Sequence, residues 1–271
     1  MSTKINKRPK KTLADIGKEI RLLTMEMSAR SKSGETGSSL SISDILAVLH
    51  FKILRLDPKK PLWSGRDRFI LSKGHGAAAY YAALALRGFF PMSHLKGHRV
   101  NDGRFHAHPS KGAAPGIEVS TGSLGHGLSI GAGMAEAVLK TKSKVYVLLG
   151  DGECNEGSVW EAARHIGSLQ MNNIVVVVDD NNVQGYPLRR ETRKVDLSGM
   201  WESCGWQVLR ADGHDVRSLE RVLSKAAKAK KPVAIIAKTV SGKGVPHIEH
   251  TQGAHYYVPD QAAVEAMRKT L

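Results

Sequence analysis

The chain has 271 residues and a formal net charge of +15, because 40 Lys and Arg residues stand against 25 Asp and Glu residues. This length can bury a substantial hydrophobic core. No apolar run approaches the length of a membrane span and no signal-peptide pattern opens the sequence, so we expect no membrane contact. The two cysteines, Cys154 and Cys204, lack metal-ligand spacing, which favours a reducing compartment, the cytoplasm.

Part of the positive charge lies in the first dozen residues. A basic surface can attract nucleic acid, anionic substrates or an acidic partner. The sequence has only 5 Phe and 6 Tyr, with no aromatic-glycine signature, which argues against an RNA-binding module. We interpret residues 1–12 as a disordered basic tail. Residues 13–271 then form one domain, because no repeat or linker interrupts them.

Hydrophobic periodicity predicts alternating helices and strands along this domain. Residues 33–37 and 185–198 favour loops, and Ser41 or Ser43 is the expected N-cap of the second helix. The expected helices cover residues 13–31, 45–50, 77–86, 130–140, 156–170, 219–226 (beginning at Asp215 or Ser218) and 260–269. The expected strands cover residues 69–72, 145–149, 174–178, 206–209 and 232–237.

The stretch 145–186 organises the rest of the chain. Two apolar runs rich in β-branched residues, 145–149 and 174–178, flank a segment of the right length for a crossover helix. Such runs are typical of a parallel sheet buried on both faces. The expected fold class is therefore α/β, with a doubly wound, mostly parallel sheet and helices on both faces.

Each of these two strands is followed by a side chain suited to a hard cation. Asp151 follows the first strand and Asn181 the second, at the sheet edge where open α/β folds bind ligands. Their oxygens suit Mg²⁺ or Ca²⁺, with phosphate and water completing the coordination. Gly150 and Gly152 let the backbone approach a phosphate. The alternative is that both polar residues only cap turns.

Histidines lie in several loops of the sequence. His75 stands between a strand and a helix in the run Lys73-Gly74-His75-Gly76, where its position supports a ligand contact and a structural role equally. Four more histidines lie between residues 94 and 108. No cysteine and no H-E-x-x-H motif accompanies them, so zinc is poorly supported.

The run Gly150-Asp151-Gly152, followed after a spacer by Asn181-Asn182, resembles the thiamine diphosphate motif. In that family the aspartate, the asparagine and a backbone carbonyl two residues later hold a metal, and the metal holds the cofactor's diphosphate. The resemblance implies thiamine diphosphate and Mg²⁺ (or Ca²⁺), with Asp151, Asn181 and the carbonyl of Val183 as metal ligands.

Further motifs, from about residue 13 onward, resemble the amino-terminal, diphosphate-binding part of transketolase in the same order. They are Leu71-Ser72-Lys73-Gly74-His75-Gly76, Ala107-His108-Pro109, Thr121-Gly122-Ser123-Leu124-Gly125-His126-Gly127, and residues 238–244 with His255 beyond. The resemblance implies catalytic roles for His75, His108 and His255. The residues that it implies for cofactor binding are His75, Gly122, Leu124, Gly152, Glu153, Asn181 and His255.

One position departs from the family's pattern. The family carries Ser-Gly-His-Pro-Gly in an early loop, and its histidine helps to bind the donor. This chain has Glu35 at that place, within Ser33-Gly34-Glu35-Thr36-Gly37. Either the donor is not an ordinary pentose phosphate handled in the usual way, or Glu35 lies away from the site as a plain surface residue.

Full-length transketolases continue into a domain that binds the cofactor's pyrimidine and supplies an activating glutamate. This sequence ends at Leu271, within the part that corresponds to the diphosphate-binding domain. The resemblance therefore implies the amino-terminal subunit of a split transketolase, with a separate carboxy-terminal subunit supplying the second domain in an α₂β₂ heterotetramer. The pair would transfer a two-carbon ketol group from a ketose, phosphorylated or otherwise anionic, to an aldose. Two alternatives are a thiamine-binding subunit of a 2-oxo acid dehydrogenase and a non-catalytic scaffold with a basic surface. The loops at His75 and His108 favour transketolase.

Overall fold

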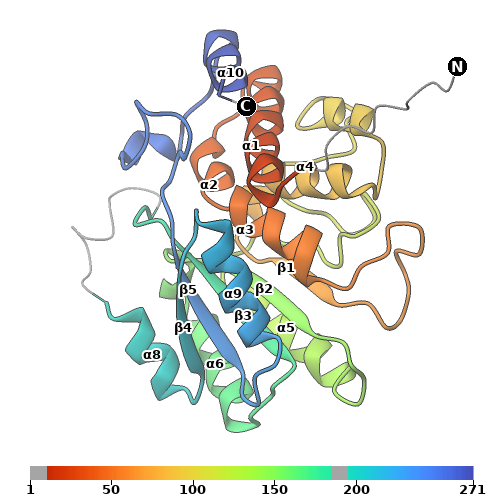
Figure 1. Ribbon diagram of the computed structural model, residues 1–271, viewed down its shortest axis with the longest axis vertical. Helices are drawn as coiled ribbons and strands as arrows, with labels where there is room; N and C mark the ends of the chain where they lie inside the picture. The colour runs from red at the N-terminus through yellow and green to blue at the C-terminus, as the bar shows by residue number, and fades with distance from the viewer. Residues whose placement is uncertain (1–10, 185–194, 271) are drawn as a thin grey trace, which may run out of the picture.

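In the computed structural model, which describes residues 11–184 and 195–270, a parallel sheet lies at the centre of the molecule (Figure 1). Its five strands run in the order β1-β2-β3-β5-β4, and every neighbouring pair is parallel. The strands are β1 (Arg68–Leu71), β2 (Val145–Gly150), β3 (Ile174–Asp180), β4 (Gln207–Asp212) and β5 (Val233–Lys238). The predicted α/β fold class is confirmed.

Helices and short turns of helix connect the strands. The α-helices are α1 (Leu13–Ser31), α2 (Thr36–Leu40), α3 (Ser43–Val48), α4 (Ala77–Arg87), α5 (His126–Ala137), α6 (Gly157–Ser168), α8 (Leu197–Ser203), α9 (Val216–Ala226) and α10 (Gln261–Arg268). The π-helical turn is η1 (Leu49–Ile53), and the 3₁₀ turns are η2 (Gly74–Gly76), η3 (Met92–Gly97), η4 (Glu153–Asn155) and η5 (Gln252–Ala254). Within the described ranges, no helix has the length and apolar character needed to cross a bilayer.

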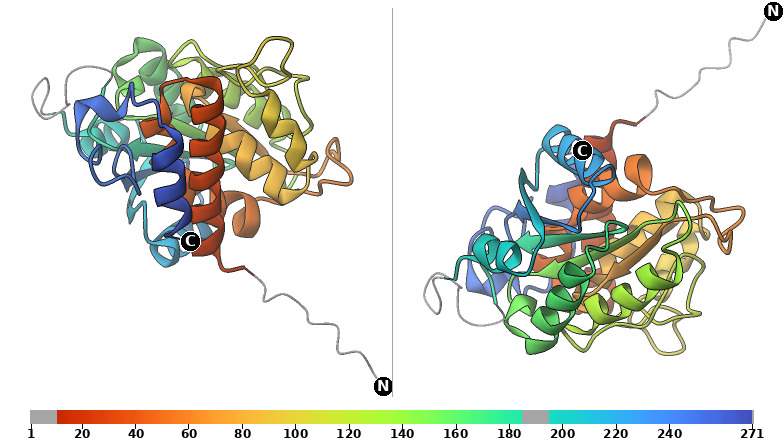
Figure 2. Two further views of the ribbon diagram at one scale, coloured as in Figure 1. Left: turned by 90° about the horizontal axis from the view of Figure 1, so that it is seen from above. Right: turned by 90° about the horizontal axis from the view of Figure 1, so that it is seen from below.

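The sheet is buried on both faces, which explains the uninterrupted apolar runs in its central strands. In β2, Tyr146 and Leu148 join a core with α1, α3, α4 and α9. The alternate residues Val147 and Leu149 join a second core with α5, α6 and α8. The closing helix α10 packs beside α1 (Figure 2).

The crossover between β2 and β3 determines which residues meet at the edge of the sheet. Helix α6 makes this connection, as the spacing predicted. The strands pair in parallel with Gly150 opposite Asp179, and β3 pairs with β5 with Asp180 opposite Lys238. The segments that follow β2, β3 and β5 therefore emerge side by side.

Several predicted boundaries are wrong around the second helix. The loop predicted for residues 33–37 ends at Glu35, and α2 begins at Thr36. Neither serine caps α3, because Ile42 occupies the N-cap position and makes no side-chain capping bond. The Ser41 hydroxyl donates instead to the buried carboxylate of Asp179.

The remaining differences lie at segment ends. Helix α5 starts at His126, earlier than predicted, directly after Gly125 with its left-handed backbone. Thr12 caps α1 through a capping box with Asp15, while residues 1–10 of the predicted tail lie outside the described residues. Most of the loop predicted for 185–198 lies outside them too, and its last two residues begin α8.

Candidate active site

A cavity of about 490 Å³ lies at the carboxyl ends of the strands. Its walls come from segments after β1, β2, β3 and β5, together with the loop before α2. Every residue that the sequence predicted for the site lines this cavity: His75, His108, Gly122, Leu124, Asp151, Gly152, Glu153, Asn181, Val183 and His255. The fold thus brings the predicted residues together, and their individual roles remain predictions.

The proposed metal ligands lie at one end of this arrangement. Asp151 follows β2, and Asn181 and Val183 follow the adjacent strand β3. Asn182 between them has a left-handed backbone, with φ at 63°, a conformation that asparagine tolerates better than most residues. The Asn181 amide donates to Asp179 Oδ2 at 2.8 Å, and its oxygen accepts from the Val183 N–H at 2.9 Å. Two hydrogen bonds therefore fix the orientation of this amide.

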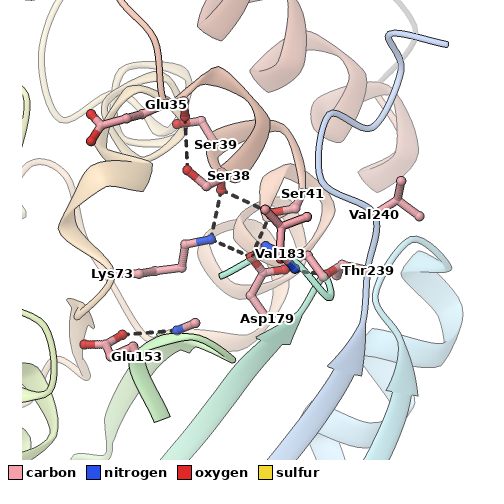
Figure 3. A network of polar contacts seen from close by, with 12 residues as sticks. Glu35, Ser38, Ser39, Ser41, Lys73, Glu153, Asp179, Val183, Thr239 and Val240 are labelled. Carbon is pink, nitrogen blue, oxygen red and sulfur yellow. Dashed lines mark hydrogen bonds and ion pairs between the residues drawn. The ribbon is translucent and has the colours of Figure 1, made fainter. Parts of the chain in front are cut away.

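A buried ion pair, which the sequence did not reveal, supports these ligands (Figure 3). Lys73 Nζ lies 2.5 Å from Asp179 Oδ2, and the two side chains are 1% and 0% exposed. Lys73 also donates to the Ser38 carbonyl at 3.1 Å. The other donors to the Asp179 carboxylate are the hydroxyls of Ser41 and Thr239 and the amide of Asn181. This network joins segments after β1, β3 and β5 to α2.

Glu153 forms a second buried junction. Its carboxylate accepts hydrogen bonds from the Ser72 hydroxyl at 2.5 Å, the Gly125 N–H at 2.9 Å and the Gly150 N–H at 3.1 Å. Burial raises the pKa of the Glu153 carboxyl, although these hydrogen bonds act in the opposite direction. The side chain therefore fixes three cavity loops relative to one another.

Histidine side chains converge on the other part of the cavity. The rings of His75 and His255 have their centroids 5.8 Å apart, and His108 lines the same wall. Burial, reinforced by the charge of Lys73, lowers the pKa of His75 to about 2. Burial also lowers the pKa of His255, while the Glu35 carboxylate opposes that shift. Neutral imidazole can both donate and accept hydrogen bonds near pH 7.

Glu35 belongs to this cavity. Its backbone N–H donates to the His255 carbonyl at 2.8 Å, and the residue is part of the cavity lining. The interpretation of Glu35 as a plain surface residue away from the site is therefore wrong. The carboxylate forms an ion pair with Arg99 at 3.2 Å.

The residues present fit a divalent cation that is shared with a diphosphate. The oxygens of Asp151 and Asn181 are hard donors of the kind that Mg²⁺ and Ca²⁺ prefer. Across the described ranges, no three His, Cys, Asp or Glu side chains gather as a metal cluster. A Cβ at Gly152 would lie 3.3 Å from Gln184, which lines the same cavity, so glycine suits this close approach of the two segments.

Comparison with known proteins agrees with this geometry. The family model described as "Transketolase, thiamine diphosphate binding domain" matches residues 13–271. The chain is 38% identical over 252 residues to an apulose-4-phosphate transketolase subunit of Actinobacillus succinogenes, covering 92% of this chain and 91% of that protein. It is 37% identical over 240 residues to a 6-deoxy-6-sulfo-D-fructose transketolase subunit of Clostridium sp. (strain MSTE9), covering 87% of each. The transketolase structure from Leishmania mexicana matches with a TM-score of 0.91 and 27% identity, over 96% of this chain and 41% of that chain.

The fold and the cavity thus define a thiamine diphosphate-binding α/β protein of the transferase class. The chain belongs to the transketolase family, in which it corresponds to the thiamine diphosphate-binding domain. This membership decides against the 2-oxo acid dehydrogenase alternative. The chain matches the proteins named as subunits over nearly their full length, and the Leishmania enzyme over less than half of its chain.

Proposed function

We propose that this chain is the diphosphate-binding subunit of a two-subunit transketolase, which transfers a two-carbon ketol group from a ketose to an aldose. The observation that carries the proposal is the cavity, where every residue implied by the resemblance lies at one edge of the sheet. Relatives that match over nearly their whole length are named as transketolase subunits. The second subunit would supply the pyrimidine-binding domain and the activating glutamate, in an α₂β₂ assembly within the cytoplasm.

Asp151, Asn181 and the Val183 carbonyl would hold Mg²⁺ (or Ca²⁺), and His75, Gly152 and His255 would contact the diphosphate. When bound, thiamine diphosphate supplies the carbon nucleophile and the electron sink of ketol transfer. The chain itself orients the metal ligands, because Asp179 fixes the Asn181 amide.

The part of the cavity wall that carries His75, His108 and His255, here called the histidine wall, would bind the sugar substrate. His108 and His255 would hydrogen-bond the substrate's hydroxyl groups or move protons at them, a task for which imidazole is suited. The low pKa of His75 keeps its ring neutral at physiological pH, so it would contact the cofactor as an uncharged hydrogen-bonding group.

Replacing the proposed metal carboxylate tests this function. We expect Asp151→Ala, in complex with the partner subunit, to lose Mg²⁺-dependent binding of thiamine diphosphate and ketol transfer, while its far-UV circular dichroism and melting temperature stay those of the wild type. The matched control is Glu202→Ala, which removes an exposed carboxylate on α8 outside the cavity. Undiminished turnover in Asp151→Ala would remove the metal assignment. A wild-type complex that does not bind the cofactor would favour the non-catalytic scaffold.

A further inference from the structure

An ion pair connects two loops at the wall of the cavity. Glu35 immediately precedes α2, and Arg99 lies two residues beyond η3. Arg99 Nη1 is 3.2 Å from Glu35 Oε2, and the two side chains are 30% and 28% exposed. Figure 3 shows the Glu35 carboxylate turned away from the chain of contacts that runs from Ser38 through Lys73 to Asp179. The carboxylate is therefore not engaged in the network that supports the metal ligands.

Both members of the pair hold an unfavourable backbone conformation. The φ angles of Glu35 and Arg99 are 65° and 52°, in the left-handed region that suits glycine better than a residue with a Cβ atom. Each conformation is held by a backbone hydrogen bond, from Glu35 to the His255 carbonyl at 2.8 Å and from Arg99 to the Phe105 carbonyl at 2.7 Å. Non-glycine residues kept in such conformations concentrate at functional sites.

Stability does not account for this pair. An ion pair that is about one-third exposed gains little, because water screens it and both long side chains lose rotamer freedom. Glycine at either position would relieve the backbone strain. Glu35 lines the cavity, and a strained, charged residue at that place therefore indicates that the Glu35 charge itself is used there.

The Glu35 carboxylate acts electrostatically on His255. It favours the charged form of His255, against the burial that lowers the pKa of that ring. The same negative potential reaches any ligand that lies against His255. A carboxylate accepts hydrogen bonds from hydroxyl groups, whereas it repels a second anion at close range in a partly desolvated cavity.

We propose that Glu35, positioned by Arg99, determines the donor that the enzyme accepts. Glu35 accepts hydrogen bonds from hydroxyl groups at the reacting end of the donor and excludes donors with a negative charge at that end. This assignment rests on the proposed function and predicts that a donor with a carboxylate next to the reacting carbonyl is a poor substrate of this enzyme. A phosphate or sulfonate group on a ketose donor lies at its far end, away from Glu35.

Two donors that deliver the same ketol fragment test this assignment. Erythrulose has no charge, whereas 3-hydroxypyruvate has a carboxylate on the reacting carbonyl carbon and releases it as CO₂ when that carbon–carbon bond breaks. The measured quantity is the ratio of kcat/KM for erythrulose to kcat/KM for 3-hydroxypyruvate, in the complex with the partner subunit. We expect Glu35→Gln, which keeps the shape but removes the charge, to lower this ratio at least tenfold. Glu35→Gly, whose backbone suits the left-handed conformation, gives the same direction if the glutamine variant folds poorly.

Substituting Arg99 should change the donor ratio in the opposite direction. A purely structural role of the ion pair would not produce opposite changes in the Glu35 and Arg99 variants. Arg99→Gln leaves the Glu35 charge without its counter-ion, so we expect the ratio to rise, and Arg99→Lys to restore it. The control Glu26→Gln removes a comparable exposed ion pair with Arg268 and should leave the ratio unchanged.

Calorimetric titration of each variant complex with thiamine diphosphate distinguishes a failure of the Glu35 assignment from a failure of the proposed function. We expect the affinity for thiamine diphosphate to be unchanged in the Glu35 variants. An unchanged donor ratio in Glu35→Gln, with normal cofactor binding, would overturn the role of Glu35, and so would a wild-type complex that prefers 3-hydroxypyruvate. A wild-type complex that binds no thiamine diphosphate would instead overturn the proposed function.

Discussion

The cavity has two ends that are built differently, and we call them the metal end and the donor end after the roles proposed for them. The metal end rests on strand register: Asp151 and Asn181 follow adjacent strands, and each donates a hydrogen bond to Asp179, which forms a buried ion pair with Lys73. The donor end rests on loops, with a partly exposed ion pair and two strained backbones. A buried, hydrogen-bonded network of this kind suits a cofactor that is the same in every catalytic cycle. A wall made of loops can change its charge without disturbing the sheet, which is where the choice of substrate can vary.

The largest expected effect on stability comes from breaking the buried pair at the metal end. Asp179→Ala leaves the Lys73 ammonium buried without its counter-ion and removes an acceptor from the hydroxyls of Ser41 and Thr239 and the amide of Asn181. We expect a loss of about 3–5 kcal/mol in the free energy of unfolding, measured by urea denaturation. The double variant Lys73→Met/Asp179→Leu should lose less than the sum of the two single variants. A loss below about 1 kcal/mol in Asp179→Ala would show that the Lys73–Asp179 pair does not stabilise the metal end.

The second expected effect is a pH dependence that comes from the core behind β1. His50 is fully buried against Phe69 of β1, and burial lowers the pKa of its ring to about 4. Because the ring in the unfolded chain binds a proton near pH 6.5, the unfolded state takes up more protons between pH 6.5 and 4. The contribution of His50 to stability is therefore fully present above pH 6.5, and roughly 3 kcal/mol of it is lost as the pH drops to 4.

Equilibrium unfolding at several pH values checks this dependence. Substituting His50→Leu should remove that part of the slope, whereas His126→Leu, on the exposed start of α5, should not. A slope that is identical in the wild type and in His50→Leu would refute the assignment.

The smallest expected effect on stability belongs to the donor end. Glu35→Gly loses a partly exposed ion pair but relieves a left-handed glutamate. These contributions oppose each other, so we expect the free energy of unfolding to change by less than about 1 kcal/mol. Thermal melts followed by circular dichroism measure the change. A loss above about 2 kcal/mol would mean that the loop at Glu35 is structural and that the contrast between the two ends is wrong.

The metal end could be predicted from the sequence because its signals are local. The apolar runs of β2 and β3, the length of α6 between them and the polar residue after each strand are all visible within 145–186. The parallel register then follows from the crossover rule, and it places Asp151 beside Asn181.

The supporting network could not be predicted in the same way. Lys73 and Asp179 are 106 positions apart, and nothing local to either residue indicates its partner. Ser41 illustrates the same limit: its type and position suggested a helix cap, but a buried carboxylate competes for its hydroxyl in the folded chain. The place of Glu35 depends on long-range contacts with His255 and Arg99, which is why the sequence left two interpretations open.

The most direct test of the central claim is a calorimetric titration with thiamine diphosphate and Mg²⁺. The chain would be co-expressed with the product of the adjacent gene, and complex formation confirmed by size-exclusion chromatography before titration. We predict that the complex binds the cofactor only when Mg²⁺ is present, that the single chain does not bind it, and that Asp151→Ala abolishes binding by the complex. A confirmed complex that binds no cofactor, or that binds it equally well without Mg²⁺ or with Asp151→Ala, would contradict a metal-held diphosphate at the carboxyl ends of β2 and β3.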